Sequence, residues 1–290
     1  FYLINYWRII DKKILISFFI LFFLGIFFSF SSTSSLAGER LNKDYYFFFT
    51  KHFIFTFLAI LIMIIISIIK TELFIKLIIP LFSLSFVLLA LVPILGEEVK
   101  GAKRWLDFYF FRLQPIEIVK PFFILMTAKI LTLEKPKNSN IKYFLGFILL
   151  SSVIILLIDQ PDLGQSILLI GSWILTVFIS GVSLIYIFIL FSISLIALSL
   201  LLFLLPEKFG YIFNRLSVFF DPNQGDKFQS SSALEAIRLG GFTGQGMGEG
   251  ILKESVPEAH TDYVIAVISE EYGSIVSVII LIIFLYISFR

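Results

Sequence analysis

A group of proton-handling side chains precedes the last apolar run of the sequence. Lys253, Glu258, His260 and Asp262 follow one another there in a short polar segment. This is the densest group of proton-handling side chains in the sequence, so a catalytic role is one interpretation of Asp262. An acid in the first turn of a helix is also stabilised by the helix dipole and needs no catalytic role. On these residues alone, both interpretations of Asp262 stay open.

Glu270 lies inside the apolar run that follows, with Glu271 beside it. If the run is one helix, Glu270 lies about 12 Å deeper than Asp262, at about 1.5 Å of rise per residue. A carboxylate at that depth needs a partner or a polar cavity. The sequence therefore predicts polar surroundings for at least one of these carboxylates.

A second group of ionisable residues combines cations with an aromatic ring. Lys103 and Arg104 stand directly before Trp105 in a polar segment. Both cations are candidates for holding a phosphate at the membrane surface, and Arg is suited to bidentate contact. The alternative is a pair of cations that extend towards the headgroups beside an interfacial tryptophan.

Glu117 and Lys120 follow Gln114 at the head of another apolar run and are three positions apart. This spacing places them on one face of a helix. Because ionisable groups in a membrane helix are costly, we expect both to face the interior of the bundle. The alternative is a structural ion pair, in which Glu117 and Lys120 only neutralise each other.

Asp162 follows Gln160 and Pro161 where two apolar runs meet with almost no loop. Asp is a good N-cap and Pro suits a first helical turn, so this segment is expected to end one helix and begin the next. Further along, a glycine-rich run contains a GxG pattern at Gly244. No strand precedes it and no βαβ unit can be drawn, which excludes a dinucleotide fingerprint. Such glycines are expected to let the backbone lie close to a ligand or another helix.

The elements that must position these residues are membrane helices. Of the 290 residues, 58% are apolar and 15% are charged, and the mean hydropathy is +0.98. No soluble core could bury so much apolar surface. A net charge of +2 spread along the chain gives no basic stripe, so nucleic acid is not an expected partner. The absence of cysteine excludes disulfides and thiolate metal sites.

The apolar runs predict an all-α, polytopic transmembrane helix bundle with about eight spans, since each crossing needs about 20 apolar residues. The charge-free stretch 163–206 is too long for one crossing and is divided near residues 180–183. The predicted spans are roughly 14–38, 52–69, 77–95, 118–133, 143–158, two within 163–206, and 262–288.

Lys and Arg near the span ends place the N-terminus in the cytoplasm. Three polar segments then lie outside, at residues 31–51, 96–114 and 206–261. The last is expected to be a large extracytoplasmic loop within a single membrane domain, residues 1–290. Long loops on the outer side often carry function.

The spacing of these motifs resembles the SEDS (shape, elongation, division, sporulation) family, which includes FtsW, RodA and SpoVE. The segments 101–105 and 114–120 are similar to its GAxRW and QPSExxK elements, 160–164 to QPDxG and 257–262 to PEAHTD. Ala259 and the glycine-rich run favour the FtsW branch over RodA. Ile116 departs from the serine usual in the family. Because the family has ten spans, the sequence is expected to be a fragment without the last two helices.

The resemblance implies a peptidoglycan glycosyltransferase that polymerises lipid II at the outer face of the bacterial inner membrane, in septal wall synthesis during cell division. The transfer is expected to be inverting. Expected partners are a class B penicillin-binding protein, other membrane proteins of the divisome and membrane lipid.

The resemblance also implies roles for single residues. The family's essential acid matches Asp262. The polyprenyl pyrophosphate leaving group needs cations, for which the candidates are Lys103, Arg104, Arg215 and Lys253, with a divalent cation (Mg²⁺ or Mn²⁺) as a candidate addition. The other candidate substrate-binding residues are Trp105, Gln114, Glu117, Lys120, Glu258 and His260.

Two functions of other classes stay open on the sequence. A transporter that flips lipid II across the bilayer would also need ionisable residues inside the membrane, such as Glu117, Lys120 and Glu270. A scaffold that only positions its partner gives no reason for so many ionisable residues.

Overall fold

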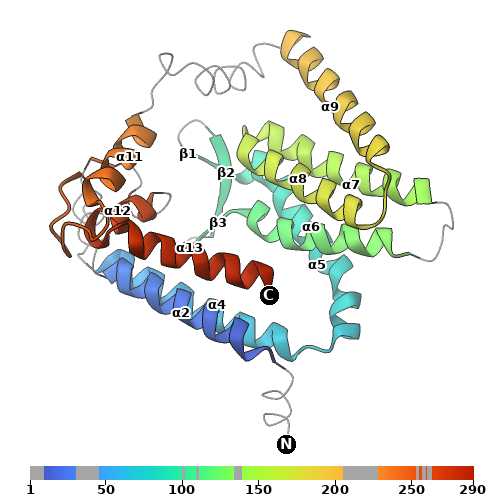
Figure 1. The fold of residues 1–290 in the computed structure, drawn as a ribbon. Coiled ribbons are helices and arrows are strands. Elements are labelled where there is room, and N and C mark those ends of the chain that lie inside the picture. Colours follow the sequence, from blue (N-terminus) through green and yellow to red (C-terminus); the bar gives the residue numbers. More distant parts are fainter. Residues whose placement is uncertain are drawn as a thin grey trace, which may run out of the picture. The chain divides into compact units, whose positions relative to one another are not determined.

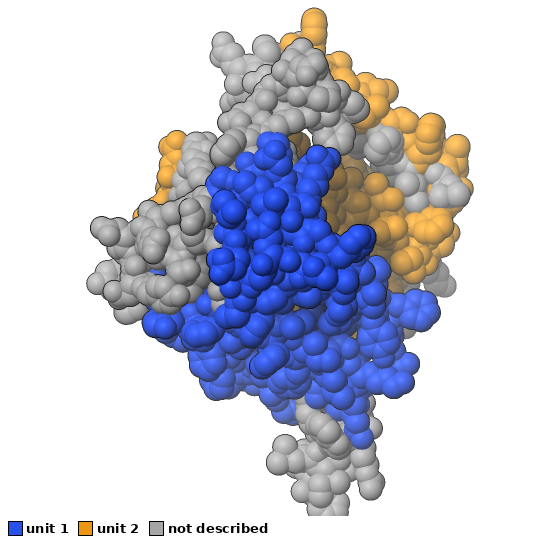
Figure 2. Space-filling model, turned by 60° about the vertical axis from the view of Figure 1, so that its left-hand side comes forward, with its two compact units in different colours: residues 1–69, 223–290 blue, residues 70–222 orange. Residues whose placement is uncertain are grey.

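The computed structural model describes residues 10–30, 46–99, 102–108, 111–133, 139–204, 228–252, 255–256, 259 and 263–290. The described part is almost entirely helical, with one small sheet, which confirms the predicted fold class (Figure 1). It divides into two compact units, residues 70–222 and residues 1–69 with 223–290, coloured separately in Figure 2.

The described part of the unit of residues 70–222 contains five helices. They are α5 (Thr71–Leu95), α6 (Pro115–Leu131), α7 (Ser139–Asp159), α8 (Leu163–Ile179) and α9 (Leu184–Leu204). Helix α6 packs against α5, α7 and α8. Its buried residues Val119 and Phe123 join Leu89, Leu157 and Trp173 in the core of this unit. The long apolar runs of the sequence thus become helices because each has neighbours against which to pack.

A three-stranded antiparallel sheet joins α5 to α6. Its strands are β1 (Glu97–Val99), β2 (Ala102–Asp107) and β3 (Arg112–Leu113), in the order β1-β2-β3. Glu98 pairs with Lys103, and Leu106 with Leu113. The sequence predicts only a polar segment at residues 96–114 and does not reveal these strands. The strands are too short for an alternating pattern to stand out, and only Leu106 of β2 is fully buried.

The other unit contains α2 (Lys12–Phe28), α4 (Phe47–Ile68), α11 (Phe228–Gly240), α12 (Val264–Tyr272) and α13 (Ser274–Phe289). Helix α2 packs against α4 and α13. Its N-cap is Asp11, whose carboxylate accepts the backbone N–H of Lys13 at 3.0 Å. The Arg290 guanidinium donates a hydrogen bond to the same carboxylate and holds the pKa of Asp11 below its ordinary value. Helix α11 falls within the segment expected to be a loop.

The predicted last span is wrong in one respect, because it is two helices and not one. Helix α12 ends at Tyr272 and α13 begins at Ser274. Between them, Gly273 has φ 87° and ψ 164°, a conformation that favours glycine. A Cβ at Gly273 would overlap the carbonyl oxygen of Phe242. The break therefore follows from a close backbone approach that an apolar pattern does not reveal.

Three of the described helices are long and apolar enough to cross a membrane: Phe47–Ile68, Thr71–Leu95 and Asn140–Asp159. Two shorter apolar helices, Leu163–Ile179 and Ser274–Phe289, accompany them. Many of their large apolar side chains are exposed, including Phe57, Leu84 and Ile155. Such surfaces suit contact with lipid, and the chain is a membrane protein.

Candidate functional site

The predicted site residues divide between described and undescribed parts of the chain. Lys103, Arg104, Trp105, Gln114, Glu117 and Lys120 are described and lie in the unit of residues 70–222. The other candidates lie outside the described residues: Arg215, Lys253, Glu258, His260 and Asp262.

Arg104 binds the turn between α7 and α8. Its Nε donates to the carbonyl oxygen of Gln160 at 3.3 Å, and its Nη2 donates to that of Pro161 at 2.5 Å. Its Nε also lies 3.8 Å from Oδ2 of Asp162. Two nitrogens of the guanidinium, Nε and Nη2, thus already donate hydrogen bonds within the protein. Contact of Arg104 with a phosphate stays a prediction and would have to use the remaining N–H groups.

The turn itself is held from three sides. Gln160 is buried, and its side-chain amide donates to the carbonyl oxygen of Leu89 on α5 at 3.3 Å. Asp162 accepts the backbone N–H of Gln165 at 3.4 Å as the N-cap of α8. This confirms the capping role predicted for Asp162. Together with Arg104, these contacts fix the turn against α5 and the sheet.

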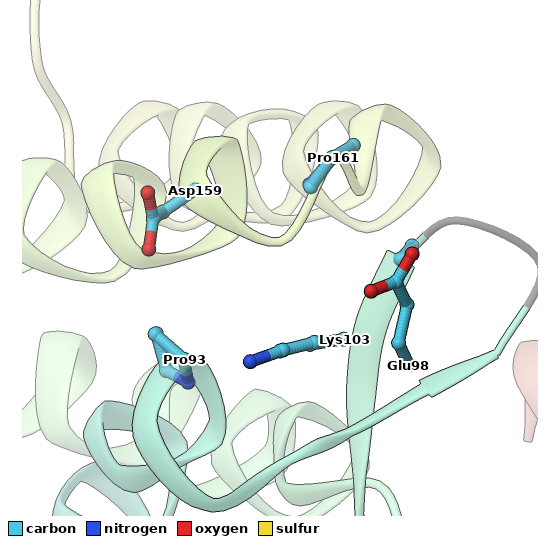
Figure 3. Close-up of a pocket in the computed structure, with 6 residues that line it drawn as sticks. Pro93, Glu98, Lys103, Asp159 and Pro161 are labelled. Carbon is cyan, nitrogen blue, oxygen red and sulfur yellow. The ribbon is translucent and has the colours of Figure 1, made fainter.

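Lys103 lies in a pocket of about 230 Å³ beside this turn (Figure 3). The pocket is lined by Pro93 of α5, Glu98, Ala102 and Lys103 of the sheet, and Asp159 and Pro161. In Figure 3 the Lys103 side chain extends into the space between Pro93 and Asp159.

The Lys103 ammonium group makes no salt bridge within 4.0 Å with any described residue, so it is available to an anionic ligand. Sequence reasoning did not select Glu98 and Asp159. Nothing in the sequence shows that the ends of α5 and α7 meet the hairpin, although Asp159 adjoins the Gln160-Pro161-Asp162 turn.

Glu117 and Lys120 form an ion pair with 2.7 Å between Nζ and Oε2. Gln165 of α8 donates to the other oxygen of Glu117 at 2.9 Å. The side chain of Lys120 is 20% exposed and that of Glu117 is 50% exposed. The pair therefore lies where α6 meets α8, with Glu117 half exposed in the first turn of α6. This arrangement fits the structural alternative at least as well as a binding role.

Trp105 and Gln114 have positions that the sheet determines. Trp105 lies on β2 opposite Glu97 and is half-buried. Gln114 is the N-cap of α6 and is also half-buried, followed by Pro115 at the first helical position. The sheet thus places the cations of β2 and the head of α6 in one region of this unit.

Comparison with protein families finds a match to the model of FtsW, RodA and SpoVE, described as "Cell cycle protein", over residues 11–290. Curated relatives share the name "Probable peptidoglycan glycosyltransferase FtsW". The one from Caulobacter vibrioides is 32% identical over 274 residues, covering 94% of this chain and 69% of the relative. The one from Wigglesworthia glossinidia brevipalpis is 34% identical, covering 96% and 76%. The one from Escherichia coli O6:H1 is 31% identical, covering 90% and 63%. The chain thus spans about two thirds of the length of these relatives.

Solved structures share the fold. A chain of a peptidoglycan synthase complex, described as coordinating polymerization and crosslinking, superposes with a TM-score of 0.71 at 22% identity. That match covers 96% of this chain and 76% of the other. The rod shape determining protein RodA of Thermus thermophilus gives a TM-score of 0.61 at 22% identity, covering 97% and 73%. Both chains have the arrangement of helices found here.

Proposed function

This chain belongs to the FtsW/RodA/SpoVE family of membrane proteins, and from that membership we propose that it forms most of a peptidoglycan glycosyltransferase that polymerises lipid II. The observation that carries the proposal is the similarity, over nearly the whole chain, to relatives named for this activity. We place the reaction at the outer face of the bacterial inner membrane and assign it to septal wall synthesis.

The chemistry assigns separate roles to an acid and to cations. The 4-hydroxyl of the acceptor sugar attacks the anomeric carbon of the donor, and Asp262 takes the hydroxyl proton. The bond from that carbon to the pyrophosphate oxygen breaks as the new glycosidic bond forms. A single displacement inverts the α-linked donor into a β-linked glycan, so no carboxylate nucleophile is needed.

The departing polyprenyl pyrophosphate carries negative charge that cations must stabilise. Lys103 is the best supported of them, because its ammonium lies in a pocket of about 230 Å³ without a salt bridge to any described residue. Arg104, Arg215 and Lys253 remain further candidates. Trp105, Gln114, Glu117, Lys120, Glu258 and His260 are proposed to contact the substrate.

A divalent cation, Mg²⁺ or Mn²⁺, is also proposed to take part. Within the described ranges, no three His, Asp or Glu side chains come together as metal ligands. The Lys103 pocket offers two carboxylates, Glu98 and Asp159, beside an ammonium. These residues alone do not fit a divalent cation, so no step of the proposed reaction passes through one.

A class B penicillin-binding protein is the proposed partner, because it would crosslink the strands that this enzyme makes. The fold similarity to a chain of a complex that coordinates polymerization and crosslinking supports this pairing. Other membrane proteins of the divisome are expected to bring the pair to the division septum, with the N-terminus of this chain in the cytoplasm.

The test is Asp262→Asn in the full-length protein, purified with its penicillin-binding partner. Asn keeps the size of the side chain but cannot take the proton, so polymerisation of labelled lipid II should fall by about 10² to 10⁴. Binding of lipid II should survive. A thermal melt checks that the variant is folded.

Two results would oppose the proposal. Near-normal glycan chains from a folded variant would remove Asp262 as the general base. Wild-type complex that makes no glycan but moves fluorescent lipid II across proteoliposome membranes would favour the transporter.

A further inference from the structure

Helix α12 carries two adjacent carboxylates that are almost completely buried. Glu270 is 0% exposed and Glu271 is 1% exposed. Removing a carboxylate from water costs free energy unless hydrogen bonds compensate. The proposed reaction uses neither residue, so their burial calls for a separate explanation.

The side chain of Glu270 binds the backbone of a segment 18 residues earlier in the chain. Its Oε1 accepts the backbone N–H of Leu252 at 2.7 Å. Its Oε2 is buried and has no hydrogen-bond partner among the described residues. The contact made by Glu270 is therefore directed at one backbone amide.

The glycine-rich run before Leu252 lies along the same end of α12. Gln245 donates its backbone N–H to the carbonyl oxygen of Glu270 at 2.9 Å, and Gly246 donates to that of Glu271 at 3.0 Å. A Cβ at Gly240 would overlap the backbone of Ser269. The absence of a side chain at Gly240 thus permits the close approach between the start of this run and α12.

The segment after Leu252 is also attached to α12. The backbone N–H groups of Ser255 and Val256 bond the carbonyl oxygen of Leu252 at 2.8 and 3.1 Å. Val256 and Ala259 are buried in an apolar cluster that includes Ala266 and Val267 of α12.

These attachment points alternate in sequence with the proposed catalytic residues. Lys253 follows Leu252, Glu258 precedes Ala259, and Asp262 directly precedes Tyr263, the N-cap of α12.

We propose that Glu270 is a positioning residue for the catalytic segment. By holding the amide of Leu252, it fixes the point from which residues 253–262 continue towards the start of α12. This inference deepens the proposed function and rests on it for its kinetic test. Glu270 acts through the backbone and touches no substrate.

The positioning role requires only an oxygen that accepts a hydrogen bond. Glu270→Gln keeps that oxygen at the same distance along the side chain, whereas Glu270→Ala removes it. Ser269→Ala is a matched control, since Ser269 is buried on the same helix but its hydroxyl contacts Ser277 of α13 at 2.7 Å. The three variants separate the hydrogen bond to Leu252 from general damage to α12.

The first measurement is hydrogen exchange of peptides covering residues 250–256 in the full-length protein. Loss of the acceptor should raise the exchange rate of the Leu252 amide by about tenfold in Glu270→Ala. Glu270→Gln and Ser269→Ala should stay close to wild type. Unchanged exchange in Glu270→Ala would overturn the inference. This result does not depend on any assay of glycan synthesis.

The second measurement is polymerisation of lipid II with the penicillin-binding partner. A displaced catalytic group can cost up to about a hundredfold, so kcat of Glu270→Ala should fall by about ten- to hundredfold with little change in KM. Glu270→Gln should restore most of kcat.

The inference is overturned if Glu270→Gln is as inactive as Glu270→Ala, because Glu270 would then supply a charge or a proton. If Glu270→Ala does not fold, Glu270→Gln alone decides the question. This variant must keep the Leu252 amide protected from hydrogen exchange and must still polymerise lipid II. A wild-type complex that makes no glycan would remove the proposed function, while the exchange result would still decide whether Glu270 holds Leu252.

Discussion

At the scale of single residues, neighbouring cations of β2 have different surroundings. Arg104 donates to two carbonyl oxygens of the turn that joins α7 to α8. Lys103 points into a pocket and has no salt bridge to a described carboxylate. Adjacent residues on a strand point to opposite sides, which explains the difference. We therefore expect Arg104 to act on stability and Lys103 on binding.

Arg104→Lys should destabilise the protein. A lysine ammonium lacks the planar fork that reaches both carbonyl oxygens at once. Hydrogen bonds to charged groups contribute about 1.5 to 3 kcal/mol each, and Arg104 is partly exposed, so we expect a loss of about 1 to 3 kcal/mol. The measurement is thermal or denaturant unfolding in detergent.

Arg112→Lys on β3 is the matched control. Arg112 pairs with Glu97 and Asp107, but its side chain is 55% exposed. Exposed ion pairs contribute about 0 to 1 kcal/mol. Equal losses in the two variants would show that Arg104 has no special role in holding the turn.

Lys103→Gln should weaken substrate binding without changing the melting temperature. The substitution removes a positive charge but no salt bridge with a described residue. A charge-assisted contact to pyrophosphate corresponds to about a ten- to hundredfold change in affinity. The measurement is the KM for lipid II, or its dissociation constant, beside a thermal melt. An unchanged affinity would remove Lys103 from the proposed site.

At the scale of elements, glycines determine where the last helices end. Gly273 separates α12 from α13 with φ 87°, and a Cβ there would overlap the Phe242 carbonyl oxygen. Gly171 lies inside α8, and a Cβ there would meet nothing within 4 Å. Both are glycines near apolar helices, and their surroundings predict opposite effects of the same substitution.

Gly273→Ala should lower stability by at least about 1 to 3 kcal/mol, because strain at positive φ adds to the overlap with Phe242. Gly171→Ala should raise stability by up to about 1 kcal/mol, since alanine favours a helix more than glycine does. Unfolding of both variants in one detergent gives the comparison. A harmless Gly273→Ala would mean that α12 and α13 can join into one continuous helix.

The sequence predicted the elements that depend on local properties and missed those that depend on contacts between distant segments. Apolar runs located every described helix of the membrane region, since length and hydropathy are local properties. The break at Gly273, helix α11 and the sheet depend on contacts between distant segments. The same holds for Arg104 and the turn, which are separated by 56 and 57 positions. The spacing of the motifs identified the candidate site residues, but it did not show which residues they contact in the fold.

At the scale of the whole molecule, the proposed reaction requires the sheet to lie on the outer side of the membrane. Helix α6 has 17 residues, so it is about 25 Å long and nearly spans a hydrocarbon core of about 30 Å. The sheet precedes α6, and Lys129 lies in its last turn. Because cytoplasmic ends are enriched in Lys and Arg, the end of α6 is expected inside and the sheet outside.

Single cysteines can test this orientation, because the 290-residue sequence contains none. Phe108, next to β2, is 43% exposed, and Leu133, after α6, is 39% exposed. Any cysteines elsewhere in the full-length protein are first replaced by serine. In spheroplasts, a membrane-impermeant maleimide should then label Phe108→Cys at once and Leu133→Cys only after permeabilisation. Equal labelling after permeabilisation is the control for accessibility. The reverse pattern would put the Lys103 pocket in the cytoplasm, where it could not hold the leaving group of a reaction at the outer face.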